Sequence, residues 1–322
     1  MRTLIRHGTV VNADGILAAD VLIEDETVVQ VGPRLAADAD RTIDATGRYV
    51  IPGGVDVHTH LDMPYGDTTS ADDFESGTIA AACGGTTTIV DFAVQDPGDT
   101  LHHALETWTR KAAGKAAIDY GFHVIVTDLT ERVEQEMDEL IGEGVTSFKL
   151  FLAYPGRLMV DDATIFRALL RTAWNGGLVL VHAENGGVID VLTKRALAAG
   201  RREPRQHALT RPARAEAEAV HRAIALAELA GAPVYIVHVS AAEAVEEVAA
   251  ARSRGLPVFA ETCPQYLFLS DERYDEPGFD GAKYVMSPPL RDRRAQERLW
   301  QGLASDDVQV VATDHCPFRM RD

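Results

Sequence analysis

The first fifty residues alternate short apolar runs with clusters of turn-forming residues and show little helical periodicity. Polar clusters such as Asn12-Ala13-Asp14-Gly15 separate the runs, and Pro52-Gly53-Gly54 follows the last one. Runs of this kind, bounded by Gly, Pro, Asn and Asp, predict β-strands joined by tight turns. Residues 1–52 are therefore predicted to form the N-terminal part of a small β-sandwich domain. Its expected strands are Thr3–Val11, Asp20–Ile23, Thr27–Val31, Thr42–Asp44 and Tyr49–Ile51.

From residue 53 onward the pattern changes to a repeated alternation of strand, loop and helix. Strands that are buried on both faces are almost continuously apolar and rich in β-branched residues. Segments of that kind are Val55–His58, Thr86–Phe92, Tyr120–Val126, Ser147–Leu152, Leu178–His182, Val234–Val239, Val258–Thr262 and Val308–Thr313. Helical stretches fall between most of them, at Asp72–Cys83, Thr100–Ala113, Arg132–Gly142, Asp162–Trp174, Arg211–Ala230 and Ala241–Arg254.

Eight such strands with intervening helices predict an α/β fold, a (β/α)₈ TIM-like barrel over residues 53–322. The competing architecture, an open doubly wound sheet, normally carries a glycine-rich turn after its first strand. Here that turn carries His58 and His60 instead. The eighth strand is followed by only nine residues, up to Asp322. We therefore expect a barrel that lacks its last helix, in a chain that is a fragment of a longer protein.

The composition excludes several classes of protein. Of the 322 residues, 46% are hydrophobic and 25% charged, and no stretch approaches the roughly 20 apolar residues of a membrane span. The formal net charge of −18 argues against binding to nucleic acid. No secretion signal is apparent at the N-terminus, and three scattered cysteines supply no disulfide framework. These features predict a cytoplasmic protein without a membrane or nucleic-acid partner.

Five polar side chains end otherwise apolar strands. Residues i and i+2 of a strand face the same side, so His58 and His60 can present two imidazole nitrogens to one point. His182, His238 and Asp314 lie in the same context on other predicted strands. Barrel enzymes place their chemistry at the carboxyl ends of the strands, and imidazole and carboxylate are ligands of divalent metal ions. The pattern predicts a metal site at this rim.

Lys149 lies in the apolar run Ser147–Leu152 and needs a separate explanation. A buried ammonium beside metal cations is disfavoured by repulsion and desolvation, and both effects lower the pKa of the amine. The free amine can react with carbon dioxide to form a carbamate, which bridges two divalent metals as a carboxylate would. The alternatives are a lysine whose ammonium reaches the rim of the barrel and a Schiff-base nucleophile.

Six segments together resemble the motifs of the dihydropyrimidinase/hydantoinase family, a cyclic-amidase branch of the amidohydrolase superfamily. The resemblance extends over the whole chain. The segments are residues 53–64 (GGVDVHTHLDMP), 147–154 (SFKLFLAY), 181–185 (VHAEN), 236–240 (IVHVS), 284–291 (YVMSPPLR) and 312–318 (ATDHCPF).

The resemblance implies a binuclear centre, with Zn²⁺ expected first and Mn²⁺ or Co²⁺ as alternatives. His58, His60 and Asp314 would bind one metal ion, and His182 and His238 the other. Carboxylated Lys149 and a hydroxide would bridge the two ions. Asp314 would also carry the proton from the attacking hydroxide to the leaving nitrogen.

The resemblance further implies residues that bind the substrate. Tyr154 matches the tyrosine whose hydroxyl stabilises the tetrahedral oxyanion, and Ser287 matches the residue whose backbone holds the edge of the cyclic ureide. Leu61, Met63 and Tyr65 lie on the loop that shapes the substituent pocket. Simple packing at the rim of the barrel is the alternative for Tyr154 and for the three loop residues.

The expected reaction is ring-opening hydrolysis of a 5,6-dihydropyrimidine or a 5-substituted hydantoin to an N-carbamoyl amino acid. An allantoinase or dihydroorotase activity is the first alternative, but Leu61-Asp62 follows the histidine pair where orotate would need a cation. A truncated, inactive or scaffolding relative is the second alternative. A homo-oligomer, tetramer or dimer, is expected. The sequence leaves open the physiological substrate, its stereochemistry and the native metal.

Overall fold

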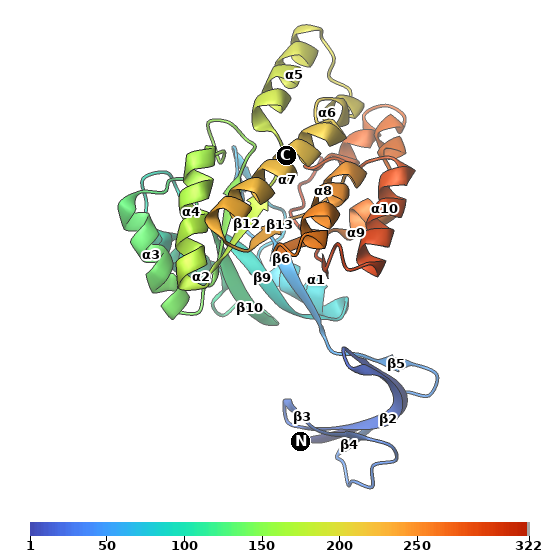
Figure 1. Cartoon of the computed structure of the whole chain (residues 1–322). Helices are drawn as coiled ribbons and strands as arrows, with labels where there is room; N and C mark the ends of the chain where they lie inside the picture. Colours follow the sequence, from blue (N-terminus) through green and yellow to red (C-terminus); the bar gives the residue numbers. More distant parts are fainter. Residues whose placement is uncertain (321–322) are drawn as a thin grey trace. The chain divides into compact units, whose positions relative to one another are not determined.

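The computed structural model describes residues 1–320. The chain divides into two compact units, Met1–Gly54 and Val55–Asp322 (Figure 1). The boundary predicted from the sequence lay after residue 52. That each unit is an independent domain stays a prediction.

The first unit is a five-stranded mixed β-sheet. β2 pairs antiparallel with β1 and β3, while β4 and β5 pair parallel to β1. Leu4, Leu22 and Leu35 form one small buried cluster of this sheet. The sequence predicted part of a β-sandwich, and the described residues of this unit form one sheet. Its strands are β1 (Arg2–Asn12), β2 (Gly15–Glu24), β3 (Thr27–Gly32), β4 (Arg41–Asp44) and β5 (Tyr49–Val50).

The second unit is built on eight parallel strands, as the sequence predicts. Neighbouring strands pair in the order β15-β14-β13-β12-β11-β10-β9-β6. The ends of this sheet approach each other through a parallel bridge between Thr59 and His315, where the His60 amide donates to the His315 carbonyl at 2.9 Å. The strands are β6 (Gly54–Thr59), β9 (Thr86–Val94), β10 (Asp119–Ile125), β11 (Ser147–Phe151), β12 (Leu178–His182), β13 (Val234–Ile236), β14 (Val258–Thr262) and β15 (Val310–Val311).

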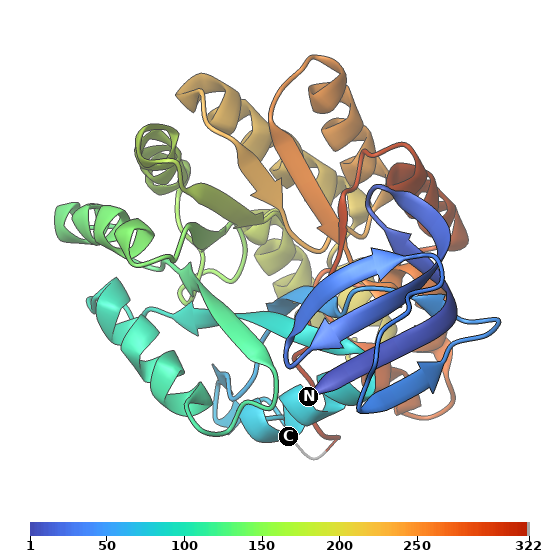
Figure 2. The same ribbon diagram turned by 90° about the horizontal axis from the view of Figure 1, so that it is seen from below.

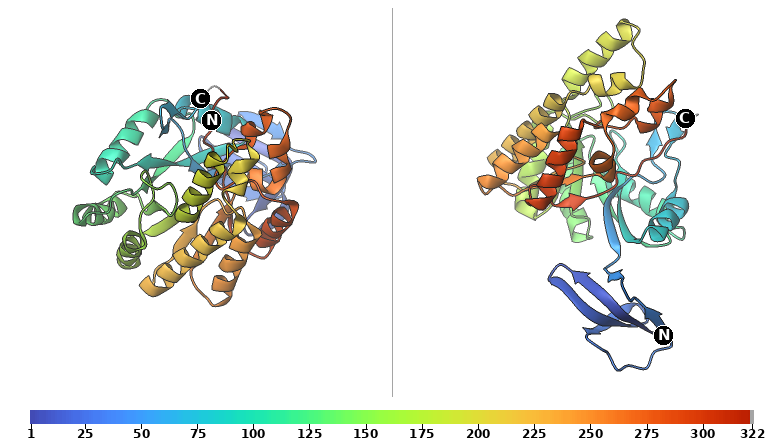
Figure 3. Two further views of the ribbon diagram at one scale, coloured as in Figure 1. Left: turned by 90° about the horizontal axis from the view of Figure 1, so that it is seen from above. Right: turned by 90° about the vertical axis from the view of Figure 1, so that its right-hand side faces the viewer.

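Helices surround this barrel on the outside, which Figure 2 shows along the barrel from below and Figure 3 from above. The six predicted helices are α1 (Phe74–Cys83), α2 (Leu101–Ala112), α3 (Glu131–Gly142), α4 (Asp162–Asn175), α7 (Ala213–Ala230) and α8 (Ala242–Ser253). Among residues 1–320, no helix is both long enough and apolar enough to span a membrane.

Other elements of this unit were not predicted. α5 begins with two glycines, which mask its helical pattern, and the remaining elements are short or highly charged. They are α5 (Gly186–Ala198), α6 (Arg205–Leu209), α9 (Pro264–Phe268), α10 (Arg293–Ala304), the 3₁₀ helices η1 (Asp271–Asp275) and η2 (Asp280–Tyr284), and the hairpin β7 (Pro64–Tyr65) and β8 (Thr68–Thr69).

Alternation along the strands decides which side chains face the inside of the barrel. On β11, Phe148 and Leu150 belong to the main core beneath the helices, whereas Phe151 belongs to a separate inner cluster. Lys149 shares the parity of Phe151 and therefore faces the interior. The same alternation on β12 places His182 on the inner side with Leu180.

Two predicted strands are shorter than expected. β13 ends at Ile236 rather than Val239, and β15 covers only Val310–Val311. The backbone adopts positive φ at His238 (41°) and Asp314 (51°), a conformation that cannot continue a strand. Both side chains thus lie just beyond the regular ladder, and not within it.

Asp56 ties β6 to the segment that follows β15. Its carboxylate accepts hydrogen bonds from the Thr313 amide at 3.0 Å and the Thr313 hydroxyl at 2.6 Å. Asp56→Ala is expected to lower the free energy of unfolding by about 1–3 kcal/mol, because it removes both acceptors where the sheet closes. Urea unfolding measures this, with Asp119→Ala at an exposed position at the start of β10 as the control. Equal urea midpoints for the two variants would contradict a role of Asp56 in closing the sheet.

Candidate functional site

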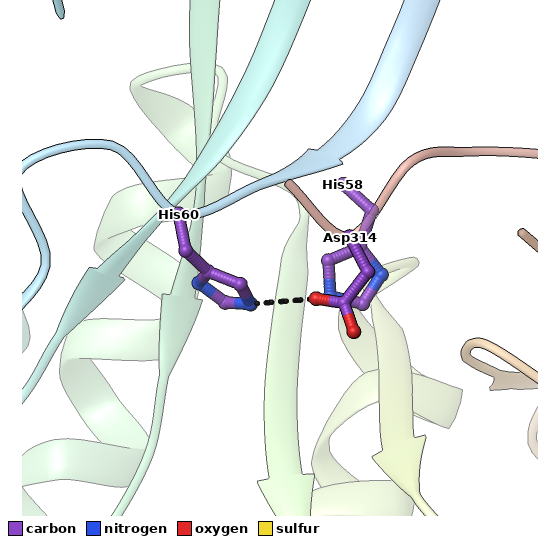
Figure 4. Close-up of side chains that lie close together, drawn as sticks. All are labelled: His58, His60 and Asp314. Atoms are coloured by element: carbon purple, nitrogen blue, oxygen red, sulfur yellow. Dashed lines mark ion pairs between the residues drawn. The ribbon is translucent and has the colours of Figure 1, made fainter. Parts of the chain in front are cut away.

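His58, His60 and Asp314 form a compact group at the carboxyl end of the barrel (Figure 4). Their ligand atoms all lie within 4.8 Å of one another. Asp314 Oδ1 lies 3.2 Å from His58 Nε2 and 3.3 Å from His60 Nε2. Both imidazoles are buried, and the Asp314 side chain is 18% exposed. One carboxylate oxygen is thus shared by two imidazoles, while the other remains available.

His182 and His238 form a second group beside the first. His182 Nδ1 lies 2.9 Å from His238 Nε2, and the ring of His238 lies 5.5 Å from that of His58. On its other side, His182 Nε2 donates to Glu184 Oε2 at 3.0 Å. Burial opposes ionisation of Glu184, but this bond holds the pKa of the carboxyl below its usual value. Glu184 therefore fixes the tautomer that directs the Nδ1 lone pair of His182 toward His238.

Lys149 lies between the two groups and is almost completely buried, at 1% exposure. Its Nζ lies 2.8 Å from His58 Nε2 and 4.2 Å from the centre of the Phe92 ring. Burial lowers the pKa of Lys149 to about 8, while Asp314 and Glu261 act in the opposite direction. The predicted bridging position is thus occupied by an amine that loses its proton more readily than an exposed lysine.

Glu261 on β14 supports both groups from beneath. It contacts His58 Nδ1 through Oε1, and the same oxygen accepts the His238 amide at 3.1 Å. Its other oxygen accepts the Tyr235 hydroxyl at 2.8 Å. Burial raises the pKa of Glu261 to about 7, against these donors. A carboxylate on Nδ1 leaves the Nε2 lone pair of His58 for a ligand, an arrangement that recurs around metal-bound histidines.

The donor set fits divalent metal ions. Burial lowers the pKa of both His58 and His60, so that their imidazoles are neutral and carry lone pairs. Burial would raise the pKa of Asp314, but the neighbouring imidazoles and Lys149 hold it well below its usual range. The buried Nδ1 atoms of His60 and His238 have no hydrogen-bond partner among the described residues. Neutral imidazoles that converge on an ionised carboxylate are typical ligands for Zn²⁺ and similar ions.

Most of the residues expected at the site line a cavity of about 320 Å³, and His58 and Leu61 are the exceptions. That volume suits a small ring with one substituent. Besides the site residues, its wall carries apolar and aromatic side chains and a few polar groups. The lining residues are His60, Met63, Tyr65, Lys149, Phe151, Tyr154, Leu158, His182, His207, His238, Gln265, Val285, Met286, Ser287, Asp314, Cys316 and Phe318.

Four of the five residues expected to bind substrate lie at this cavity, namely Met63, Tyr65, Tyr154 and Ser287. Leu61 lies elsewhere than predicted. It is 2% exposed and belongs to the main core, where its side chain packs against Gly77. Leu61 alternates with His60 and therefore faces the side opposite to the two histidines, so its side chain lies in the core and not at the cavity.

Asp91 on β9 holds the turn that carries the first histidine pair. Its carboxylate accepts the Thr59 hydroxyl and the Leu61 amide, both at 2.8 Å, and the Trp108 indole at 3.1 Å. Burial raises the pKa of Asp91 to about 7, and these donors oppose that shift. Asp91 thereby fixes the backbone on both sides of His60.

Several other polar residues lie outside the two histidine groups. His315 contacts Asp72 at 2.8 Å, and His123 contacts the Val57 carbonyl at 3.0 Å. Cys316 lines the cavity, but burial raises the pKa of its thiol to about 12, which leaves it a poor nucleophile. His102, His103 and His221 lie on helices and face acidic side chains.

Sequence reasoning missed Glu184, Glu261 and His207. The first two carried a readable signal, because each is an acidic residue at the end of an apolar strand, like the predicted ligands. His207 lies on α6, a five-residue helix that the pattern did not reveal, and no local signal placed it at the cavity.

Comparisons with known proteins identify the family of this chain. Residues 49–260 match the model of the amidohydrolase family. This match defines the class of protein. A D-hydantoinase from Streptomyces coelicolor is 58% identical over 98% of this chain and 69% of its own length. A D-hydantoinase from Geobacillus stearothermophilus is 53% identical over 99% of this chain and 68% of its own length.

Solved structures give the same result. The crystal structure of a dihydropyrimidinase from Brevibacillus agri superposes with a TM-score of 0.97 at 53% identity, covering 99% of this chain and 70% of that one. The chain therefore belongs to the D-hydantoinase/dihydropyrimidinase family of the amidohydrolase superfamily. This is a family of cyclic amide hydrolases. The predictions of family, barrel fold and enzyme class are confirmed.

Glu261→Gln is expected to weaken metal binding about 10- to 100-fold, because the charge that orients His58 is lost while every ligand remains. Competition with a chromophoric chelator measures the affinity. Glu136→Gln is the matched control, since Glu136 is also a buried carboxylate but accepts the Leu101 amide away from the site. Unchanged affinity in the Glu261 variant would contradict its supporting role.

Proposed function

We propose that this protein hydrolyses the cyclic amide bond of 5,6-dihydropyrimidines or 5-substituted hydantoins and releases N-carbamoyl amino acids. The observation that carries the proposal is that His60, His182, His238 and Asp314 line one cavity, with the buried imidazole of His58 in contact with Asp314. Family membership and the volume of the cavity support a small cyclic substrate.

His58, His60 and Asp314 would hold one divalent ion, and His182 and His238 a second. Lys149 would bridge the two ions after its amine has added carbon dioxide to form a carbamate. Its burial and its contact with His58 support this role. A protonated amine would be repelled by metal cations, whereas a carbamate at Nζ is an anion and would be attracted to them. Zn²⁺ is the expected ion, with Mn²⁺ or Co²⁺ as alternatives. When bound, such ions polarise the amide carbonyl and lower the pKa of water.

The side chains around the cavity would transfer the proton, stabilise the oxyanion and bind the substrate. Asp314 would accept the proton of the attacking water and pass it to the leaving nitrogen. Because Oδ1 faces His58 and His60, Oδ2 is the oxygen left for this transfer. The Tyr154 hydroxyl would donate to the oxygen of the tetrahedral intermediate, and burial raises the pKa of Tyr154, which keeps its proton in place. The backbone at Ser287 would hold the ureide edge of the ring.

The cavity favours a neutral ring over an anionic one. Within the described part of the chain, Lys149 is the one lysine or arginine along its wall, and Met63, Phe151, Leu158 and Phe318 make part of the wall apolar. A carboxylate such as that of dihydroorotate would find no exposed cation there. An apolar 5-substituent would fit.

The homo-oligomer, the cytoplasmic location and the two-domain division all remain predictions.

One assay tests the proposed activity directly. The full chain, loaded with Zn²⁺, is expected to hydrolyse dihydrouracil or a 5-substituted hydantoin faster than allantoin or dihydroorotate, with chelation abolishing turnover. Metal analysis accompanies the assay. Faster hydrolysis of dihydroorotate would reverse the order of candidates. Loaded metal without turnover of any of the four would indicate an inactive or scaffolding relative.

A second experiment tests the carbamate. Metal-loaded protein exchanged with ¹³C-bicarbonate is expected to show one protected carbamate signal in the ¹³C NMR spectrum, and Lys149→Met should abolish it. Lys149→Met should also lower metal content from two ions per chain toward one, because the shared anion is missing. Lys194→Met, at an exposed lysine of α5, is the matched control. An unmodified amine in fully loaded protein would rule out the bridge.

A further inference from the structure

A buried ion pair joins α7 to the wall segment that carries Ser287. Arg291 Nη2 donates to Glu216 Oε2 at 2.8 Å, and the two side chains are 9% and 2% exposed. Glu216 lies in the first turn of α7, and Arg291 lies four residues beyond Ser287. Neither side chain lines the cavity of the site. Removing two charges from water offsets most of their attraction, so stability alone is a weak reason for such a pair.

Ser240 closes this pair into a ring of three hydrogen-bonded side chains. Its hydroxyl donates to Glu216 Oε2 at 2.6 Å and accepts from Arg291 Nε at 3.1 Å. The other oxygen of Glu216, Oε1, accepts the Ser240 amide at 2.8 Å and the Ala241 amide at 3.1 Å. One carboxylate therefore holds the backbone two and three residues beyond His238.

Arg291 connects this ring to the cavity wall through a short and stiff stretch of chain. Its third nitrogen, Nη1, donates to the Arg211 carbonyl just before α7, so the planar guanidinium is fixed in three directions. Pro288 and Pro289 lie between Arg291 and Ser287, and the ring of each proline fixes its φ. A guanidinium held in place thus limits where the backbone of Ser287 can lie.

The same segment is also attached on its other side, by neutral hydrogen bonds. The Tyr266 hydroxyl donates to the Pro288 carbonyl at 2.7 Å, and the Tyr274 hydroxyl accepts the Leu290 amide at 2.8 Å. These tyrosines belong to α9 and η1, which follow β14. Arg291 therefore supplies the connection to α7 and to the loop after β13, while the tyrosines fix the opposite side.

We propose that Glu216 and Arg291 are positioning residues that set the place of the Ser287 backbone relative to His238. A cyclic ureide needs both at once, because its edge would be held at Ser287 while its carbonyl lies at the metal centre that includes His238. The proposal rests on the proposed function. It adds a pair of residues outside the cavity that determines how tightly the ring is held.

Two substitutions break the ion pair from opposite ends. Arg291→Gln removes the guanidinium, and Glu216→Gln keeps an oxygen for the two amides but loses the charge. Each is expected to raise KM about 10-fold and to change kcat less than about threefold, because a displaced edge contact weakens ground state and transition state alike. Metal content should stay at the wild-type value. Arg298→Gln, at a half-buried ion pair with Asp307, is the matched control and should leave KM unchanged.

The split between KM and kcat separates positioning from general loosening of the structure. Loosening would lower kcat and metal content together, and either that result or a wild-type KM in both folded variants would overturn the proposal.

A double substitution keeps the test decisive if one charge left alone prevents folding. Glu216→Gln/Arg291→Gln leaves no unpaired buried charge, so it is expected to fold. Its KM should be close to that of either single variant, because the same contact is lost only once. Multiplied increases in KM, or a wild-type KM in the folded double variant, would contradict a shared role.

Amide hydrogen exchange measured by mass spectrometry does not depend on activity. Peptides that cover residues 284–291 should exchange faster in Arg291→Gln than in the wild type, whereas peptides that cover residues 147–154 should not change. Unchanged exchange over residues 284–291 would overturn the proposal even in an active enzyme. Absence of turnover in wild-type protein, together with the expected difference in exchange, would instead contradict the proposed function.

Discussion

The site depends on one geometric constraint, the alternation of side chains along parallel strands that surround a common axis. Every second residue of each strand faces inward, and the parallel strands all end at the same rim of the barrel. Lys149 on β11 and His182 on β12 therefore face the same interior that His58 enters from β6. No single segment of the chain could gather these groups. The barrel brings them together because its strands are neighbours in order.

Burial of so many imidazoles would be costly without carboxylates to orient them. Glu261, Glu184 and Asp314 supply that orientation, and each contacts a ring nitrogen of the cluster. Glu261 also accepts the His238 amide, so one side chain holds a ring from β6 and the backbone beyond β13. The polar interior is therefore a network in which His58 and His182 are each oriented by a carboxylate behind the ring, and the backbone of His238 is held by the same Glu261 that contacts His58.

Much of this could be predicted from the sequence, since strands that are buried on both faces have an unmistakable apolar pattern. The eight strands, the inward lysine and the histidine pair all follow from that pattern. Leu61 was expected at the cavity and lies in the core, because it alternates with His60 and therefore faces the opposite side. His207 was missed since its helix is too short to show periodicity.

Three residues at the site adopt a left-handed backbone, with φ of 41° at His238, 51° at Asp314 and 66° at Tyr154. Asparagine tolerates this conformation almost as well as aspartate, whereas β-branched residues do not. Exchange of Asp314 for asparagine would therefore remove a charge while the local chain path survives. A related protein can therefore lose the carboxylate at this position and still keep its fold. An intact barrel of this kind does not by itself indicate an active enzyme.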